Sequence, residues 1–237
     1  MRRESATPSQ EISWKKITAS QAATPLDANL RACYLLAFAA FLRLGEVTYN
    51  PADVLNKTRF LQTKVTRSCI RFSPNYDHLT LHLKRSKTDV DHKGVTILVA
   101  TIEGPFCTIA AMRHHFVMDP QPNDAPLFNF NGFPFTKDRL QKALKASLQN
   151  ASVPTPGLIL HSFRKGAAQH AKDSGIRDEQ IQAMGRWTSS SVHFYFTTSP
   201  ALLYSYSFQF QTSKPLPFTN TSTLWAQASH ATPVVAS

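Results

Sequence analysis

Two short segments in the second half of the chain contain residue types that could bind and attack a phosphodiester. The first is His161-Ser162-Phe163-Arg164, and the second is Gly185-Arg186-Trp187, with Tyr195 ten residues after the glycine. A guanidinium offers two parallel donors that match two phosphate oxygens, and a phenol can act as a nucleophile. The set has no cluster of carboxylates of the kind that a divalent metal prefers. It suits the binding of one phosphodiester and its attack by a tyrosine.

Two cations upstream could complete such a site, and each also has an ordinary structural explanation. Arg43 follows a strongly apolar stretch and needs a ligand or a partner, and Glu46 is a candidate partner for an ion pair. Lys87 lies in a charged loop of the kind that is usually solvated. The acids Asp89 and Asp91 have no third carboxylate at suitable spacing, so a metal site is not expected.

The downstream residues have structural alternatives as well. His161 and Arg164 are three residues apart at a predicted helix start, so they share a face where an anion is favoured. They could equally be surface side chains. Trp187 and Tyr195 could be ordinary core aromatics. The joint occurrence of these residues, rather than any one of them, favours a functional site.

The overall composition favours a polyanionic partner. The 237 residues are enough for one domain of moderate size or two small ones. A net charge of +11 points to nucleic acid first and to an anionic membrane second. The longest apolar run, 33–42, is about half of what spans a bilayer, and the N-terminus has no signal-peptide core. An intracellular protein is therefore expected, and its three dispersed cysteines are expected to be buried thiols.

The hydrophobic periodicity predicts an α+β domain that is mainly helical. A helix is expected over 25–42, with Asp27 as its cap and Gly45 as its stop. Strands at 69–72, 78–84 and 95–99 predict a small three-stranded antiparallel sheet, with Lys87 near its second turn. Further helices are predicted at 105–118 with Pro105 near its first position, at 137–151 capped by Thr136, at 161–174 stopped by Gly175, at 178–184 stopped by Gly185, and at 189–196.

Composition also divides the chain into three parts. Residues 1–24 are polar and predict an N-terminal arm. Residues 25–211 carry the periodic elements, although 46–68 show no clear pattern. Residues 212–237 are rich in Ser, Thr, Pro and Ala, which predicts a disordered tail.

In their order along the chain, these motifs resemble the catalytic domain of tyrosine recombinases, the phage-integrase-like site-specific recombinases. The similarity rests on Arg43 with Glu46, Lys87 in a predicted hairpin, His161-x-x-Arg164, and Gly185-Arg186-Trp187 with Tyr195. It covers residues 25–205 and is greatest to eukaryotic members derived from mobile elements. The resemblance implies their fold, a nuclear location if the source is eukaryotic, and a role in DNA recombination and DNA integration.

The resemblance also implies a role for each matching residue. Tyr195 would attack the scissile phosphate and leave a 3′-phosphotyrosyl link with a free 5′-hydroxyl, without metal or nucleotide cofactor. Arg43 and Arg164 would neutralise the non-bridging oxygens. Lys87 would protonate the leaving 5′-oxygen, and His161 would contribute proton transfer and phosphate contact.

One further family position follows the glycine and is filled by His or Trp. Trp187 is favoured there, because an indole N–H can donate to phosphate while the ring supports the tyrosine segment; Arg186 is the alternative. The implied partner is double-stranded DNA, on which the chain would act as a homo-oligomer. The expected additional DNA-binding cations are Lys84, Arg85, Lys165 and Arg186.

One departure from the family leaves two other functions open. Family members carry an N-terminal DNA-clamping domain, whereas only 24 residues precede the matched region here. A non-catalytic DNA-binding relic or domesticated domain is one alternative. A type IB topoisomerase-like activity, which shares the chemistry but relaxes DNA without exchanging partners, is the other.

Overall fold

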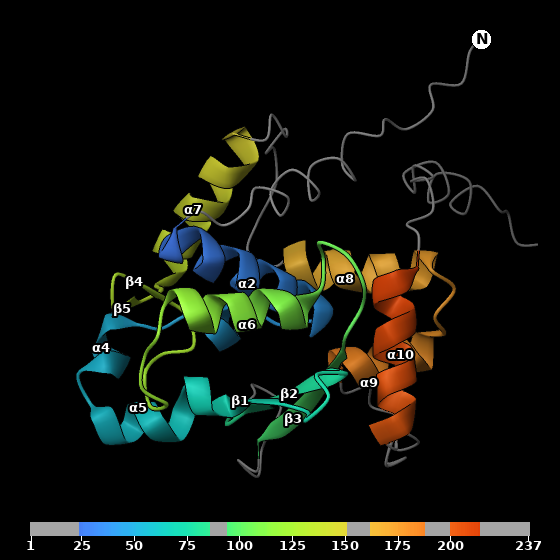
Figure 1. Ribbon diagram of the computed structural model, residues 1–237, viewed down its shortest axis with the longest axis horizontal. Coiled ribbons are helices and arrows are strands. Elements are labelled where there is room, and N and C mark those ends of the chain that lie inside the picture. The colour runs from blue at the N-terminus through green and yellow to red at the C-terminus, as the bar shows by residue number, and fades with distance from the viewer. Residues whose placement is uncertain (1–23, 86–93, 151–161, 188–199, 214–237) are drawn as a thin grey trace, which may run out of the picture.

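A long buried helix, α2 (Pro25–Ala39), runs through the middle of the molecule (Figure 1). The computed structural model describes residues 24–85, 94–150, 162–187 and 200–213. From Ala28 onward every residue of α2 is buried except the half-buried Arg31 and Phe38, which is typical of a helix enclosed by other elements on most sides. The predicted arm and the predicted tail fall largely outside the described residues.

The first helix begins at Pro25 as predicted, but its predicted cap and its predicted C-terminal end were wrong. The cap is Thr24, whose Oγ1 accepts the backbone N–H of Asp27, because the cap residue must precede the first turn. The helix ends at Ala39 because Phe41 turns the chain with a φ of 51°. Gly45 is no stop, since it lies inside the next short helix, α3 (Leu44–Val47).

The predicted antiparallel sheet is confirmed, with strand order β1-β2-β3. Its strands are β1 (Ile70–Phe72), β2 (His78–Leu83) and β3 (Val95–Ala100). Leu79, Leu81 and Leu83 alternate along β2 and are fully buried, as period two requires for a half-buried strand. The connection from β2 to β3 contains Lys87, Asp89 and Asp91, which lie outside the described residues.

The unassigned stretch 46–68 consists of short pieces, which explains its lack of periodicity. Two further helices, α6 and α7, were predicted, although α6 begins at Thr108 with Cys107 as its cap, so Pro105 is not in its first turn. Thr136 caps α7 as predicted, with its Oγ1 accepting the N–H of Arg139. The elements are α4 (Pro51–Val54), α5 (Lys57–Thr63), the 3-10 helix η1 (Arg67–Cys69), α6 (Thr108–Met118), the hairpin β4 (Asn129–Phe130) with β5 (Phe133–Pro134), and α7 (Lys137–Asn150).

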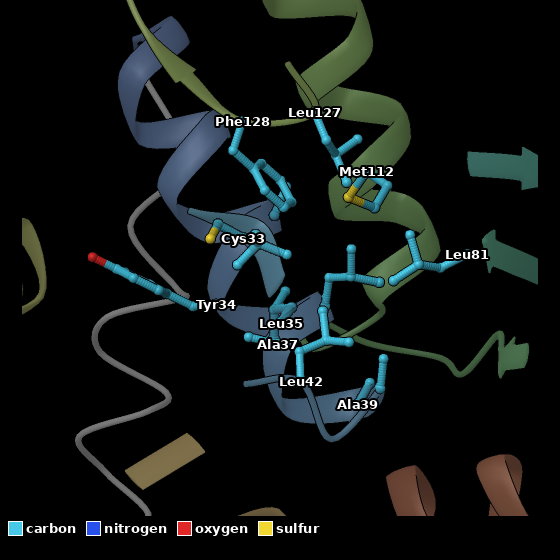
Figure 2. Close-up of a cluster of buried hydrophobic side chains, with 14 of the residues drawn as sticks. Cys33, Tyr34, Leu35, Ala37, Ala39, Leu42, Leu81, Met112, Leu127 and Phe128 are labelled. Carbon is cyan, nitrogen blue, oxygen red and sulfur yellow. The ribbon is translucent and has the colours of Figure 1, made fainter. Parts of the chain in front are cut away.

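The main hydrophobic core fills the space between α2, α6 and the sheet. Figure 2 shows Leu81 of the sheet, Met112 of α6 and Leu42 together with side chains of α2, and Phe128 closes the far end of the cluster. Cys33, Cys69 and Cys107 are buried and free, as predicted. No helix in the described ranges is long and apolar enough to cross a membrane.

Three C-terminal helices form a second, smaller core: α8 (Ser162–Asp173), α9 (Asp178–Gly185) and α10 (Pro200–Thr212). Gly175 stops α8 as predicted, with a φ of 78°. Gly185 is the last residue of α9, and the left-handed residue that ends this helix is Arg186. Helix α10 was not predicted, and the predicted helix at 189–196 lies outside the described residues. The buried side chains of this core are Phe41, Ala167, Ala171, Ile176, Ile181 and Phe210.

Tyr49 fixes the chain just after α3, because its hydroxyl donates to the carbonyl of Val65 and accepts the N–H of Leu127. Tyr49→Phe should lower the free energy of unfolding by about 1–2 kcal/mol, since those two backbone groups also bond each other at 3.2 Å and are not left wholly unpaired. Urea unfolding followed by circular dichroism measures this. Tyr76→Phe, at an exposed turn, is the matched control. Equal midpoints for the two variants would contradict the assignment.

Candidate functional site

Three arginines from separate elements meet at the turn that follows α2. Arg43 precedes the first residue of α3, Arg164 lies in the first turn of α8, and Arg186 follows the last residue of α9. The carbonyls of Ala40 and Phe41 accept from Arg164 and Arg186, and Arg43 lies two residues after Phe41. Folding thus brings Arg43 together with two cations that lie more than a hundred residues further along the chain.

Glu46 is the shared acceptor of this cluster. Its Oε1 lies 3.3 Å from Nη1 of Arg43, and its Oε2 lies 3.1 Å from Nη2 of Arg186. The same Oε2 also accepts the backbone N–H of Arg43 at 2.8 Å. The expected Arg43–Glu46 pair is therefore present. The second partner, Arg186, was not anticipated.

Arg164 is the least accessible cation of the cluster, at 6% exposed. Its Nη1 donates to the carbonyl of Phe41 at 2.9 Å, and its guanidinium lies over the ring of Trp187, 4.2 Å from the centroid. Its Nη2 is buried and has no hydrogen-bond partner among the described residues. A desolvated donor of this kind is costly unless a ligand accepts from it.

Burial, followed by the charges of Arg43 and Arg186, lowers the pKa of Arg164 to about 10, and Glu46 opposes this shift. Burial is also the main cause of the lowered pKa of Arg186. Arg164 therefore stays protonated at neutral pH. Three guanidinium groups face one carboxylate, so the cations of the described cluster outnumber its anions. Arg43 has the most open side chain, at 25% exposed, and faces a ligand most readily.

A glycine is required at position 185 by the ring that lies against it. A Cβ on Gly185 would come within 1.6 Å of Cζ3 of Trp187. Arg186 has a left-handed backbone with a φ of 57°, so the side chains of Arg186 and Trp187 point in different directions. Trp187 covers Arg164. Arg186 points inward and donates to the carbonyls of Ala40, at 2.9 Å, and Phe41, at 3.4 Å.

Of the six residues expected to be catalytic, the structure brings together Arg43, Arg164 and Trp187. Lys87, His161 and Tyr195 lie outside the described residues. Sequence reasoning missed Phe41, whose carbonyl accepts from both buried arginines. Its position left no signal, because a phenylalanine just beyond a helix looks like one more core residue.

The four additional DNA-binding candidates differ in their surroundings. Arg85 is exposed. Lys84 is tied to the fold, with Nζ donating to the carbonyl of Leu61 at 2.7 Å and to Oγ1 of Thr66 at 3.1 Å. Arg186 is bonded as described above. Lys165 lies on α8, and its side chain is not among those described.

Comparison with known proteins shows the fold of the tyrosine recombinase catalytic domain. No protein family and no curated sequence matches the chain. Among solved structures, the chain is similar to XerH site-specific recombinase bound to difH substrate in a pre-cleavage complex. The TM-score is 0.54 at 14% identity, covering 93% of this chain and 50% of that one.

Two further structures are similar to about the same degree. The post-cleavage complex of XerH with palindromic difH gives a TM-score of 0.53 at 16% identity, covering 93% of this chain and 50% of that one. The FLP recombinase–Holliday junction complex gives 0.54 at 12% identity, covering 98% and 58%. The chain thus spans between half and three fifths of the structures that it matches. Identities this low define a fold, and function must be argued from the site.

The shared carboxylate gives a direct test of the cluster. Glu46→Gln keeps the shape and removes the negative charge, which leaves Arg43 and Arg186 without their partner. The free energy of unfolding should fall by about 3 kcal/mol, as for other broken buried pairs. Chemical denaturation measures the loss.

The control is Asp124→Asn, which breaks the exposed pair between Lys57 and Asp124. This change should leave the midpoint almost unchanged, because exposed pairs contribute little. If both variants melt like the parent, the carboxylate of Glu46 does not hold the cluster together.

Proposed function

We propose that this chain cleaves and rejoins double-stranded DNA through a 3′-phosphotyrosyl intermediate, as in DNA recombination and integration. The observation that carries the proposal is the buried, unpartnered Nη2 of Arg164 within an arginine cluster of net positive charge. A fold matched by recombinases bound to DNA supports it. A buried guanidinium donor without an acceptor is costly, and a phosphate oxygen that accepts from it would offset that cost.

The arginines would bind the scissile phosphate. Arg164 offers its free Nη2, and Arg43 offers an accessible guanidinium, so the two non-bridging oxygens can each accept from a cation. Both groups are already held in place by Phe41 and Glu46. They need little reorganisation when charge builds up on a five-coordinate phosphorus, and preorganised donors of this type lower the barrier most.

The covalent step would use Tyr195, His161 and Lys87. The phenolic oxygen of Tyr195 forms a bond to phosphorus as the bond from phosphorus to the 5′-oxygen breaks. The phenolic proton passes to His161, and Lys87 delivers a proton to the leaving 5′-oxygen, which departs as a hydroxyl. The reverse attack by a 5′-hydroxyl restores the phosphodiester, so neither metal nor nucleotide is consumed.

Tyr195 is proposed as the nucleophile from its place in the sequence. The described residues before and after it are Trp187, which packs on Arg164, and Pro200, the first residue of α10. Tyr195 lies between these two anchors in the sequence. Trp187 suits the position beside the phosphate better than Arg186, whose guanidinium is already bonded to protein groups.

The chain would act on DNA as a homo-oligomer. The sequence motifs around Lys87 and His161 favour a mobile-element origin and a nuclear location. Two other functions would give different results on the same substrates. A DNA-binding relic would bind without cleaving, and a type IB topoisomerase-like enzyme would relax supercoils without forming recombinant products.

DNA affinity should depend steeply on salt, because phosphate contacts release counterions. The logarithm of the affinity should fall linearly with the logarithm of the salt concentration, by roughly 0.9 per phosphate neutralised. Fluorescence anisotropy with labelled duplex DNA measures the slope. Arg85→Ala, at an exposed site, should reduce the slope by about 0.9. Binding that does not change with salt would instead favour a protein partner.

Tyr195→Phe should abolish the covalent adduct and leave salt-sensitive DNA binding and the melting temperature unchanged, since only the nucleophilic oxygen is removed. The assay incubates the full chain with duplexes nicked near the cleavage site, denatures the products and resolves protein–DNA adducts by electrophoresis. Tyr204→Phe and Tyr206→Phe on α10 are the matched controls and should retain the adduct. An adduct that persists in Tyr195→Phe would identify another nucleophile. No adduct from the parent on any such duplex would favour the relic.

A further inference from the structure

Helix α10 is fixed to the end of the sheet by both backbone groups of one residue. Oγ of Ser207 accepts the N–H of Ala100, and Nε2 of Gln211 donates to the carbonyl of Ala100, each at 2.8 Å. Ala100 is the last residue of β3. Ser207 is buried, so this contact replaces water at the strand end.

The same helix also reaches the turn on which the arginines converge. Phe210 is fully buried, and its ring centroid lies 5.0 Å from that of Phe41 and 5.3 Å from that of Phe38. Nε2 of His170, on α8, donates to the carbonyl of Phe210 at 3.0 Å. One face of α10 therefore bridges the sheet, the end of α2 and α8.

Phe41 needs such support because its backbone is in the left-handed region, with a φ of 51°. This conformation is unfavourable for a residue with a bulky side chain, by about 1–2 kcal/mol. The ring of Phe41 is buried between Phe210 and Trp187. Packing of that ring offsets the strain and keeps the turn in place.

The backbone turn at Phe41 also fixes the positions of two arginine side chains. Because Phe41 is left-handed, the carbonyls of Ala40 and Phe41 point toward α8 and the end of α9, where they accept from Arg186 and Arg164. We propose that α10 is a strap, and that Phe210 and Phe41 are positioning residues that aim the phosphate-binding arginines without touching the substrate. The effect of the strap on DNA cleavage rests on the proposed function, whereas its effect on the arginine positions does not.

The strap connects the sheet with the helices that carry the arginines. β3 is an edge strand of the sheet, and Arg164 lies on α8. Through Ser207 and Phe210, α10 holds the sheet and the arginine-bearing helices against each other. A substitution that weakens the packing of α10 would therefore displace the arginine side chains although no arginine is replaced.

The central variant is Phe210→Leu in the full chain, because it removes the ring contact with Phe41 and keeps an apolar side chain. Its matched control is Phe128→Leu, an equal change in the main core at the far end from Leu42 (Figure 2). Phe208→Leu, on the exposed side of α10, controls for changes in the helix itself.

Two readouts separate positioning from stability. The first is the ¹⁵N NMR signal of the arginine side chains and its titration with inorganic phosphate, which needs no DNA and no cleavage. The second is the rate of adduct formation on nicked duplex DNA, compared with DNA affinity. Phe210→Leu should shift the Arg164 and Arg186 signals, weaken phosphate binding, and slow adduct formation at least about tenfold with DNA affinity within twofold, because misplaced donors cost rate more than binding.

A double variant sharpens the test. Phe41→Leu should slow adduct formation like Phe210→Leu, and the combination should be no slower than the worse single variant, because both changes remove one contact. Additive losses would overturn the strap. So would arginine signals that stay unchanged in Phe210→Leu, or shift equally in Phe128→Leu.

The two proposals fail separately. A parent chain that forms no adduct defeats the proposed function, while the arginine signals and phosphate titration still decide the strap. If Phe210→Leu does not fold, Ser207→Ala takes its place, since it loosens the same helix at Ala100. Shifted Arg164 and Arg186 signals in Ser207→Ala would support the strap, and unchanged signals would overturn it.

Discussion

The structure depends on a carboxylate that serves two guanidinium groups while a third has none. Glu46 is almost fully buried and holds Arg43 with one oxygen and Arg186 with the other. Charges removed from water are costly, and a single carboxylate offsets only part of three cations. The positive charge that Glu46 does not offset affects Arg164, whose pKa is lowered by burial and by its two cationic neighbours. A bound phosphate would supply the missing negative charge, so the same imbalance that costs stability creates affinity for an anion.

Backbone geometry determines where the excess positive charge of the arginines lies. Phe41 and Arg186 are both left-handed although neither is glycine. The first turn presents carbonyls to the arginines, and the second sends Arg186 inward while Trp187 covers Arg164. Aromatic packing holds each turn, since the ring of Phe41 contacts Trp187 edge to face and Phe210 at a tilted angle. Local strain is thereby tolerated at the site and offset in the small core beside it.

The elements that sequence reasoning predicted are those whose pattern is local. Alternating leucines in β2 and the amphipathic spacing of α7 follow from one strand or one helix alone. Residues such as Phe41 and Ser207 could not be placed, because their roles depend on partners over 100 residues away. Helix α10 was missed since its aromatic and polar residues alternate without a clear apolar stripe, its buried groups facing a strand end as well as a core. Arg186 was expected at the DNA or beside the phosphate, yet its sequence gives no sign of the carbonyls that it meets.

The arginines and the tyrosine carry different kinds of information about this chain. Arg164 and Arg186 each bond to backbone carbonyls of the turn, so a chain that had lost cleavage would still need them to fold. Their presence therefore does not by itself argue for bond breaking. Under the proposed function, Tyr195 and Lys87 act only in the breaking and rejoining of the phosphodiester bond. If these residues serve only chemistry, their loss should leave stability and phosphate binding untouched. The proposed function thus separates binding from cleavage: the arginines on the described elements would hold the phosphate, and Tyr195, His161 and Lys87 would supply the reacting groups.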